Sequence, residues 1–188
     1  MTVAGNDKDE VLFQLPSWRP GRYELQNFAK NVVRWKATNE SGETLAHLKL
    51  TKDCWKVKSE GATEIRIEYD YYAAQADAGA CWVDEDLFYF NPVHCCMYIP
   101  DRISEACEIE ISVPDHFQIA TSLKRSATHR FIAADFHELA DSPVMASPSL
   151  QHHMYEAEKT NFHVWMHGEC NPDWGKLRSE EHTSELQS

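Results

Sequence analysis

The sequence predicts a mainly β protein, an antiparallel β-sandwich or curved open sheet with one or two short helices. Apolar and polar residues alternate with a period of two in most of the patterned segments of the 188-residue chain, which is typical of half-buried strands. These segments are short and are separated by turn residues, while helical patterns are few. Short strands spaced by turns favour packed sheets over helical bundles or α/β units.

Residues 63–71 show the alternation most clearly, because Glu64, Arg66 and Glu68 stand between apolar neighbours. The apolar face of this segment consists of Ile65, Ile67, Tyr69 and Tyr71. Residues 107–113 repeat the pattern until a proline, which cannot donate a ladder hydrogen bond. Shorter segments with strand character are residues 11–15, 46–50, 55–57, 117–123, 129–133 and 162–166.

Two segments have helical character. Residues 26–33 predict about two turns, with Phe28 and Val32 on one face. Residues 135–140 predict a single turn, because Pro143 follows and disfavours helix in the residue before it.

Composition and charge exclude several classes of protein. Hydrophobic residues make up 43 % of the chain and charged residues 26 %, which is typical of a globular domain rather than of disorder. No apolar run approaches the roughly 18 residues of a membrane span. The net charge of −12 excludes nucleic acid as a partner, since phosphate binding needs clustered Lys and Arg. An acidic surface either serves solubility alone or attracts a cation such as a peptide's amino group.

The six cysteines form no Cys-x-x-Cys pair, which excludes zinc ribbons and thioredoxin-like motifs. They are Cys54, Cys81, Cys95, Cys96, Cys107 and Cys170. An even number permits three disulfides in a secreted protein, whereas buried free thiols pack as small hydrophobes. Residues 1–10 contain no signal peptide, so we expect a cytoplasmic protein.

The last eleven residues, 178–188, resemble a translated sequencing adapter rather than native protein. We therefore expect a single β domain over residues 1–177, with the coding sequence interrupted near Leu177 and further sequence lost. Fusion scars of this kind are excluded from fold reasoning.

Two histidine motifs resemble zinc-protease signatures without completing one. His163 and His167 have His-x-x-x-His spacing, but Val164 stands where the catalytic glutamate belongs. The segment also alternates like a strand, on which the two rings lie about 13 Å apart, too far for one zinc ion. His137 begins a second such pattern, but Asp141 replaces its second histidine.

Adjacent ligand types are also poor chelators. His94, Cys95 and Cys96 are consecutive, as are His152 and His153, and neighbours on a strand point to opposite faces. We therefore assign no catalytic, cofactor-binding or metal-binding residue to this chain. The six tryptophans are either core residues or an aromatic binding platform: Trp18, Trp35, Trp55, Trp82, Trp165 and Trp174.

Three segments carry a family resemblance. Residues 15–31 read Leu-Pro-Ser-Trp-Arg-Pro-Gly-Arg-Tyr-Glu-Leu-Gln-Asn-Phe-Ala-Lys-Asn, with Pro20 and Gly21 at the centre of a predicted type II turn. Residues 67–74 read Ile-Glu-Tyr-Asp-Tyr-Tyr-Ala-Ala, and residues 134–143 read Ala-Asp-Phe-His-Glu-Leu-Ala-Asp-Ser-Pro. In this combination and order they resemble the N-terminal domain of the M-sixty-one peptidases, the glycyl aminopeptidase family of zinc metallopeptidases.

The resemblance implies an all-β N-terminal domain followed by a thermolysin-like catalytic domain and a PDZ-like domain. Because this sequence contains no His-Glu-x-x-His, no zinc ligand is carried over, and zinc is expected in the missing catalytic domain. The family's opening strand is expected to be incomplete here, which would leave a sheet edge unpaired.

The resemblance therefore predicts a non-catalytic domain that packs on its own catalytic domain and meets peptide substrate only indirectly, by shaping the cleft. Asp141 and Ser142 are the candidate substrate-facing residues, and the acidic residues 84–86 are a second place to receive a peptide amine. The alternative is a free-standing β-sandwich binding module that uses exposed aromatic side chains. A small complete enzyme is disfavoured, because no nucleophile and base have productive spacing.

Overall fold

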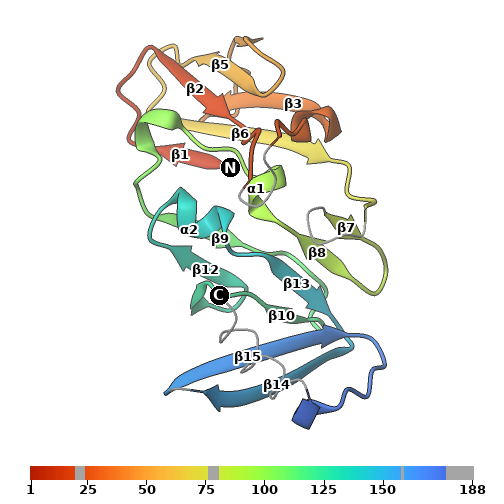
Figure 1. Ribbon diagram of the computed structural model, residues 1–188. Coiled ribbons are helices and arrows are strands. Elements are labelled where there is room, and N and C mark those ends of the chain that lie inside the picture. Colours follow the sequence, from red (N-terminus) through yellow and green to blue (C-terminus); the bar gives the residue numbers. More distant parts are fainter. Residues whose placement is uncertain (20–23, 76–80, 158, 177–188) are drawn as a thin grey trace.

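The computed structural model describes residues 1–19, 24–75, 81–157 and 159–176. Within these residues the protein is mainly β and its strands pair antiparallel, as the sequence predicts (Figure 1). The strands are β1 (Thr2–Ala4), β2 (Glu10–Gln14), β3 (Val32–Asn39), β4 (His47–Lys49), β5 (Cys54–Lys58), β6 (Glu64–Tyr71), β7 (Trp82–Val83), β8 (Phe88–Phe90), β9 (Cys107–Glu110), β10 (Gln118–Ala120), β11 (Lys124–Ala127), β12 (Arg130–Ala133), β13 (Val144–Ser147), β14 (Leu150–Ala157) and β15 (Thr160–His167). The helices are η1 (Phe28–Asn31), α1 (Pro92–Cys95), η2 (Pro100–Arg102) and α2 (Phe136–Ala140).

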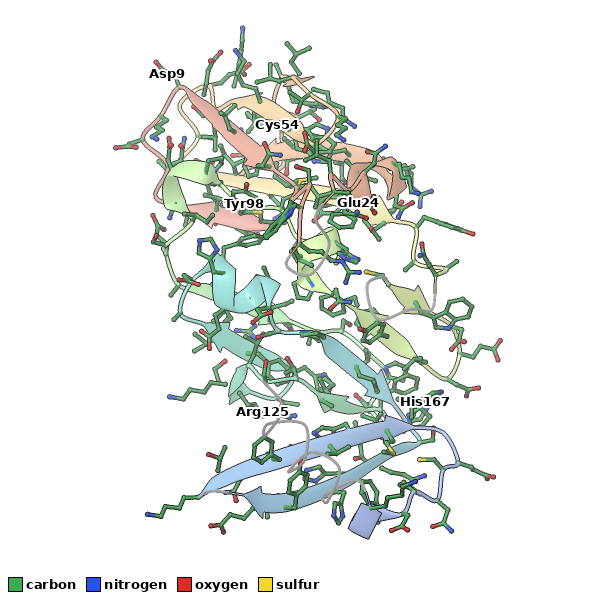
Figure 2. All side chains as sticks on the ribbon, viewed as in Figure 1. Asp9, Glu24, Cys54, Tyr98, Arg125 and His167 are labelled. Atoms are coloured by element: carbon green, nitrogen blue, oxygen red, sulfur yellow. The ribbon has the colours of Figure 1, made fainter. Side chains whose placement is uncertain are left out.

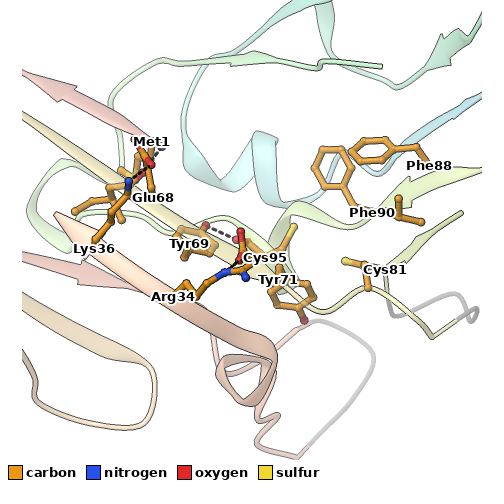
Figure 3. Close-up of a pocket in the computed structure, with 14 residues that line it drawn as sticks. Met1, Arg34, Lys36, Glu68, Tyr69, Tyr71, Cys81, Phe88, Phe90 and Cys95 are labelled. Carbon is orange, nitrogen blue, oxygen red and sulfur yellow. Dashed lines mark hydrogen bonds and ion pairs between the residues drawn. The ribbon is translucent and has the colours of Figure 1, made fainter. Parts of the chain in front are cut away.

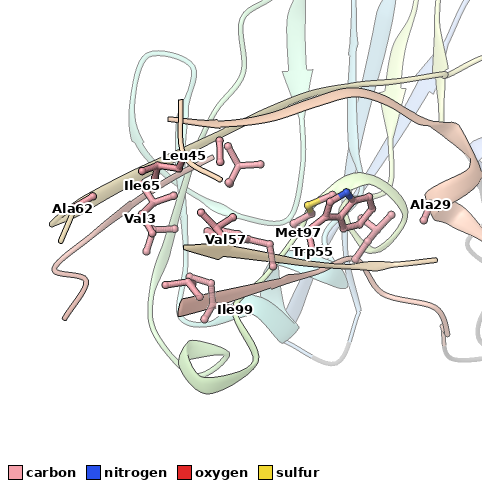
Figure 4. Packing of buried hydrophobic residues seen from close by; sticks show 14 of the residues in the cluster. Val3, Ala29, Leu45, Trp55, Val57, Ala62, Ile65, Met97 and Ile99 are labelled. Atoms are coloured by element: carbon pink, nitrogen blue, oxygen red, sulfur yellow. The ribbon is translucent and has the colours of Figure 1, made fainter. Parts of the chain in front are cut away.

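The N-terminal half is a β-sandwich. One sheet has the strand order β1-β6-β3 and the other β2-β5-β4. Apolar side chains from both sheets meet between them (Figure 4), and Phe13, Val57 and Ile65 are fully buried there. We call this cluster the first core: Val3, Val11, Phe13, Leu15, Phe28, Ala29, Ala37, Leu45, Trp55, Val57, Ala62, Ile65, Ile67, Met97 and Ile99.

A second group of sheets follows. Strands β10-β13-β8-β7 form one sheet and β11-β12-β9 another, and α2 contributes Phe136 and Leu139 to the apolar cluster beside them. We call this cluster the second core: Cys81, Phe90, Ile111, Phe117, Ile119, Leu123, Phe131, Ala133, Phe136, Leu139, Val144 and Ala146.

The end of β6 and the single turn α1 connect the two cores. The hydroxyl of Tyr69 donates to the carbonyl of Cys95 at 2.5 Å, while Tyr71 belongs to β6 and packs on the second core. Phe28 of the first core stacks on His94 of α1, with ring centroids 4.1 Å apart. Aromatic side chains therefore fix the sandwich to the second layer.

Strands β14 and β15 form a separate two-stranded hairpin, paired from Leu150↔His167 to Ala157↔Thr160. In Figure 2, His167 lies at the end of this hairpin that adjoins the rest of the molecule, and its Nδ1 is 3.0 Å from Oγ of Ser147 in β13. Beyond that end, the hairpin shares no sheet with another strand of the described chain.

The structure corrects one helix and confirms another. The two-turn helix expected over residues 26–33 is only η1, because Val32 and Val33 pair with Tyr71 and Asp70 in the sheet. The turn expected over residues 135–140 is confirmed as α2. The predicted turn at Pro20 and Gly21, the boundary at residue 177 and the tail 178–188 lie outside the described residues.

We expected an unpaired sheet edge near the start of the chain, and the structure places the short strand β1 at this edge. This strand of three residues pairs with β6 along Thr2↔Arg66 to Ala4↔Glu64 and lies at the edge of its sheet. The Arg102 guanidinium donates to the carbonyl of Ala4 at 2.9 Å and holds both carboxylate oxygens of Glu105. A side chain from η2 thus fastens this short edge strand.

Candidate functional site

The segment that contains the two predicted substrate-facing residues is rigidly built. Asp135 caps α2 by accepting from the amide of Glu138 at 2.8 Å, and the Glu138 carboxylate accepts in turn from the amide of Ala134 at 2.5 Å. The first bond satisfies an amide that the helix N-terminus leaves free, and the second fixes the chain just before the cap. Because Phe136 and Leu139 are buried in the second core, the turn has a defined orientation on the sheets.

Asp141 and Ser142 differ in what they can offer a ligand. Ser142 is 3 % exposed, and its hydroxyl donates to the carbonyl of Glu138 at 2.7 Å and accepts from Ser122 Oγ at 2.9 Å. Asp141 is exposed, while its amide is bound to the carbonyl of His137 at 3.0 Å. Ser142 therefore fixes the segment and Asp141 presents a carboxylate at the surface. Their contact with substrate stays a prediction.

The acidic residues 84–86 form the turn of the β7–β8 hairpin. Asp84 accepts from Trp82 Nε1 at 2.7 Å and from the amides of Asp86 and Leu87 at 2.9 and 2.7 Å. The hydrogen bond from Trp82, followed by those amides, lowers the pKa of the Asp84 carboxyl. Both of its oxygens are thus engaged within the turn, which leaves Glu85 and Asp86 as the free carboxylates for a cation.

A cavity of about 830 Å³ opens between the sandwich and the second layer (Figure 3). One side is charged, where Lys36 pairs with Glu68 at 2.6 Å and Arg34 pairs with Asp70. The hydrogen bond from Lys36 lowers the pKa of the Glu68 carboxyl. Exposed ion pairs add little to stability, so these four residues mainly set the polarity of the cavity mouth.

The opposite side of the cavity is apolar and contains sulfur. Its lining includes Tyr71, Phe88 and Phe90, together with Cys81 and Cys95. Burial raises the pKa of Tyr71 to about 12, although a hydrogen bond from Asn31 Nδ2 opposes the shift. Sequence reasoning missed this site, because the residues that meet here come from β6, α1 and the segment before β7 and have no diagnostic spacing.

The structure brings none of the predicted histidine motifs into a chelating arrangement. His163 and His167 lie on β15, and among the described residues no three His, Cys, Asp or Glu side chains are grouped to hold a metal ion. His152 and His153 occupy opposite faces of β14, one stacked on Trp165 at 4.1 Å and the other on Trp174 at 4.0 Å.

The structure also bears on the run of His94, Cys95 and Cys96 and on the state of the cysteines. His94 and Cys95 lie on the helical turn α1 rather than on the expected strand, so their side chains do not simply alternate between two faces. All six cysteines are free thiols in this structure, with Cys54 and Cys81 buried and the other four partly buried.

The tryptophans do not form a common platform. Trp35 and Trp55 stack at 5.7 Å, and Trp55 belongs to the first core. Among the six, Trp18 is the one exposed large aromatic, at 48 %. This distribution suits core packing better than a continuous surface for a ligand.

The hairpin β14–β15 exposes apolar side chains. Met154 is 53 % exposed and Phe162 is 39 % exposed, although Phe162 stacks on Tyr155 with centroids 5.2 Å apart. Apolar side chains exposed on a two-stranded ribbon are typical of a surface that another element covers.

The described residues thus form an antiparallel β-sandwich joined to a second group of sheets, with a projecting hairpin. The family model for the Peptidase M61 N-terminal domain matches residues 1–148, and the chain belongs to this family. No curated protein sequence matches the chain.

The fold also matches a solved structure, that of an aminopeptidase N family protein from Idiomarina loihiensis. The two share 20 % identity with a TM-score of 0.84, and the match covers 95 % of this chain and 31 % of that one. The chain therefore spans about a third of the length of this structural neighbour.

No helix in the described residues is long and apolar enough to cross a membrane.

Proposed function

We propose that this chain is the non-catalytic N-terminal domain of a zinc-dependent aminopeptidase, which packs on a catalytic domain and helps to shape its substrate cleft. The match of the family model over residues 1–148 carries the proposal. It is supported by the coverage of 31 % of the aminopeptidase-like neighbour, whose remaining length has no counterpart in this chain.

The zinc ion belongs to the catalytic domain in this proposal. Tetrahedral zinc sites need three or four convergent N, S or O ligands, and the described residues offer no such group. We therefore assign no catalytic step to the described residues.

The hairpin β14–β15 is the surface that we assign to domain packing. It begins at Leu150, just beyond the family match that ends at residue 148. Met154 and Phe162 lie on opposite faces of this ribbon, and each supplies exposed apolar area that a domain packed around the hairpin would bury.

Asp141 is the residue of this domain that we assign to the cleft. Its carboxylate is exposed at the end of a capped and buried turn, which positions it without using it for folding. A carboxylate of this kind can receive the amino group of a peptide, and hydrogen bonds to charged groups contribute about 1.5–3 kcal/mol.

Asp141→Asn in the longer protein encoded by the same gene tests this role. We expect kcat/KM for a glycyl p-nitroanilide to fall roughly tenfold to a hundredfold, the change that follows from losing such a bond. Asp115→Asn, at another exposed aspartate, is the matched control and should leave the constant unchanged. Equal constants for Asp141→Asn and the unsubstituted protein would remove Asp141 from the cleft.

A further inference from the structure

Two cysteines face each other across the cavity between the sandwich and the second layer. Cys81 immediately precedes β7, and Cys95 is the last residue of α1. Figure 3 shows both side chains at the cavity wall with their sulfur atoms turned toward one another. Fourteen residues of chain separate them, so the pair is created by the fold rather than by a local motif.

The surroundings of the two thiols shift their pKa values in opposite directions. The Cys95 thiol donates to the carbonyl of Asn91, 3.5 Å from its Sγ. Hydrogen bonding with Cys95 lowers the pKa of Cys81 to about 5, with a further contribution from His94. Hydrogen bonding with Cys81 and Cys96, followed by burial, raises the pKa of Cys95 well above its usual range.

His94 is the second unusual group at this position. The residue is 1 % exposed, and Nε2 of its ring has no hydrogen-bond partner among the described residues. A buried polar atom without a partner costs free energy. Its imidazole stacks on Phe28, so the ring is held where a positive charge or a donated proton favours the Cys81 thiolate.

We propose that Cys81 and Cys95 form a peroxide-reactive dithiol site, in which Cys81 attacks a hydroperoxide and Cys95 resolves the product as a disulfide. Both residues line the cavity of about 830 Å³, which is large enough to hold a small hydroperoxide. Reactive thiols are typically thiolates beside cationic or donor groups, often with a resolving cysteine next to them.

The reaction proceeds in two balanced steps. The Cys81 thiolate attacks one oxygen of the hydroperoxide; an S–O bond forms, the O–O bond breaks, and the departing oxyanion takes up a proton, which leaves a sulfenic acid. The Cys95 sulfur then attacks the Cys81 sulfur; an S–S bond forms, the S–O bond breaks, and hydroxide leaves as water with the Cys95 proton. The two sulfurs together lose two electrons to the hydroperoxide, and two equivalents of an external thiol restore them by exchange and leave as a disulfide.

The disulfide would connect the start of β7 to the turn α1. Strand β7 pairs with β8 on one edge, and on the other edge it hydrogen-bonds the segment that follows β6, with Val83 N donating to the Ala73 carbonyl at 3.0 Å. The turn α1 is fixed to β6 by the Tyr69 hydrogen bond to Cys95, so oxidation would add a covalent bond between two segments that both adjoin β6.

Mass spectrometry after treatment of the whole chain with hydrogen peroxide tests the proposal. We expect a peptide pair joined through Cys81 and Cys95 with the loss of two hydrogens. Cys95→Ser should leave a sulfenic acid on Cys81 that dimedone traps, and Cys81→Ser should abolish the disulfide. Cys54→Ser is the matched control, since burial raises the pKa of that thiol, and it should not change the product.

The pH dependence supplies a second readout that needs no substitution. Oxidation of Cys81 should change less than about twofold between pH 8 and pH 6, because its thiolate persists, whereas a thiol of ordinary pKa slows roughly fiftyfold to a hundredfold. A disulfide between Cys95 and Cys96, or oxidation of Cys54 as fast as that of Cys81, would overturn the proposal. So would a Cys81 rate that falls with the ordinary thiols.

Discussion

The sandwich and the hairpin β14–β15 are both built from antiparallel strands, but they differ in how far their apolar side chains are buried. In the sandwich, two sheets enclose Phe13, Val57 and Ile65 so completely that none retains exposed surface. In the hairpin, strands of eight residues leave Met154 53 % exposed and Phe162 39 % exposed. The sandwich therefore has a closed apolar core of its own. An isolated two-stranded ribbon is marginally stable, so the stability of the hairpin depends on what packs against it.

The largest effect should come from the closed core of the sandwich. Phe13→Ala removes a fully buried ring that packs edge-on to Trp35, with centroids 6.4 Å apart. We expect the free energy of unfolding to fall by about 3–5 kcal/mol, from lost burial and the cavity left behind. Urea unfolding followed by tryptophan fluorescence measures it, and a loss below about 1 kcal/mol would mean that the sandwich is not the stable part.

An intermediate effect is expected at the junction of the two cores. Tyr69→Phe keeps the ring but removes the hydroxyl that donates to the Cys95 carbonyl at 2.5 Å. The carbonyl then loses a partner in a partly buried position, which should cost about 1 kcal/mol. Urea unfolding of the variant checks the value. A cost near zero would show that β6 and α1 are held together by packing alone.

The smallest effect should come from the hairpin. Met154→Ser changes a side chain that is 53 % exposed, so the free energy of unfolding of this chain should change by less than about 0.5 kcal/mol. In the longer protein the same substitution should cost more, because the side chain is then buried at the domain interface. Equal costs in the two proteins would contradict the assignment of this surface to packing.

Alternation and capping predicted much of the fold. The regular alternation of β6 and β15 and the Asp135–Glu138 cap of α2 can be read locally, because each depends on neighbours in the sequence. Strand β3 could not be predicted in this way. The left-handed backbone of Arg34 and the register shift between Val33 and Lys36 interrupt the alternation of its side chains between the two faces.

The site was less predictable than the fold. Asp141 was identified through family resemblance, and the structure adds that its carboxylate is exposed while the hydroxyl of Ser142 is engaged. The pair of Cys81 and Cys95 depends on tertiary packing of α1 against the segment before β7. Neither the spacing of the two cysteines in the sequence nor the composition of the chain predicts such a contact.

The most direct test of the central claim is peptidase activity of this chain itself. The purified protein is incubated with a glycyl p-nitroanilide, with and without added zinc, and with a chelator. A non-catalytic N-terminal domain predicts no release of p-nitroaniline under any of these conditions. Zinc-dependent turnover that the chelator abolishes would reveal a ligand set in this chain and would contradict the account.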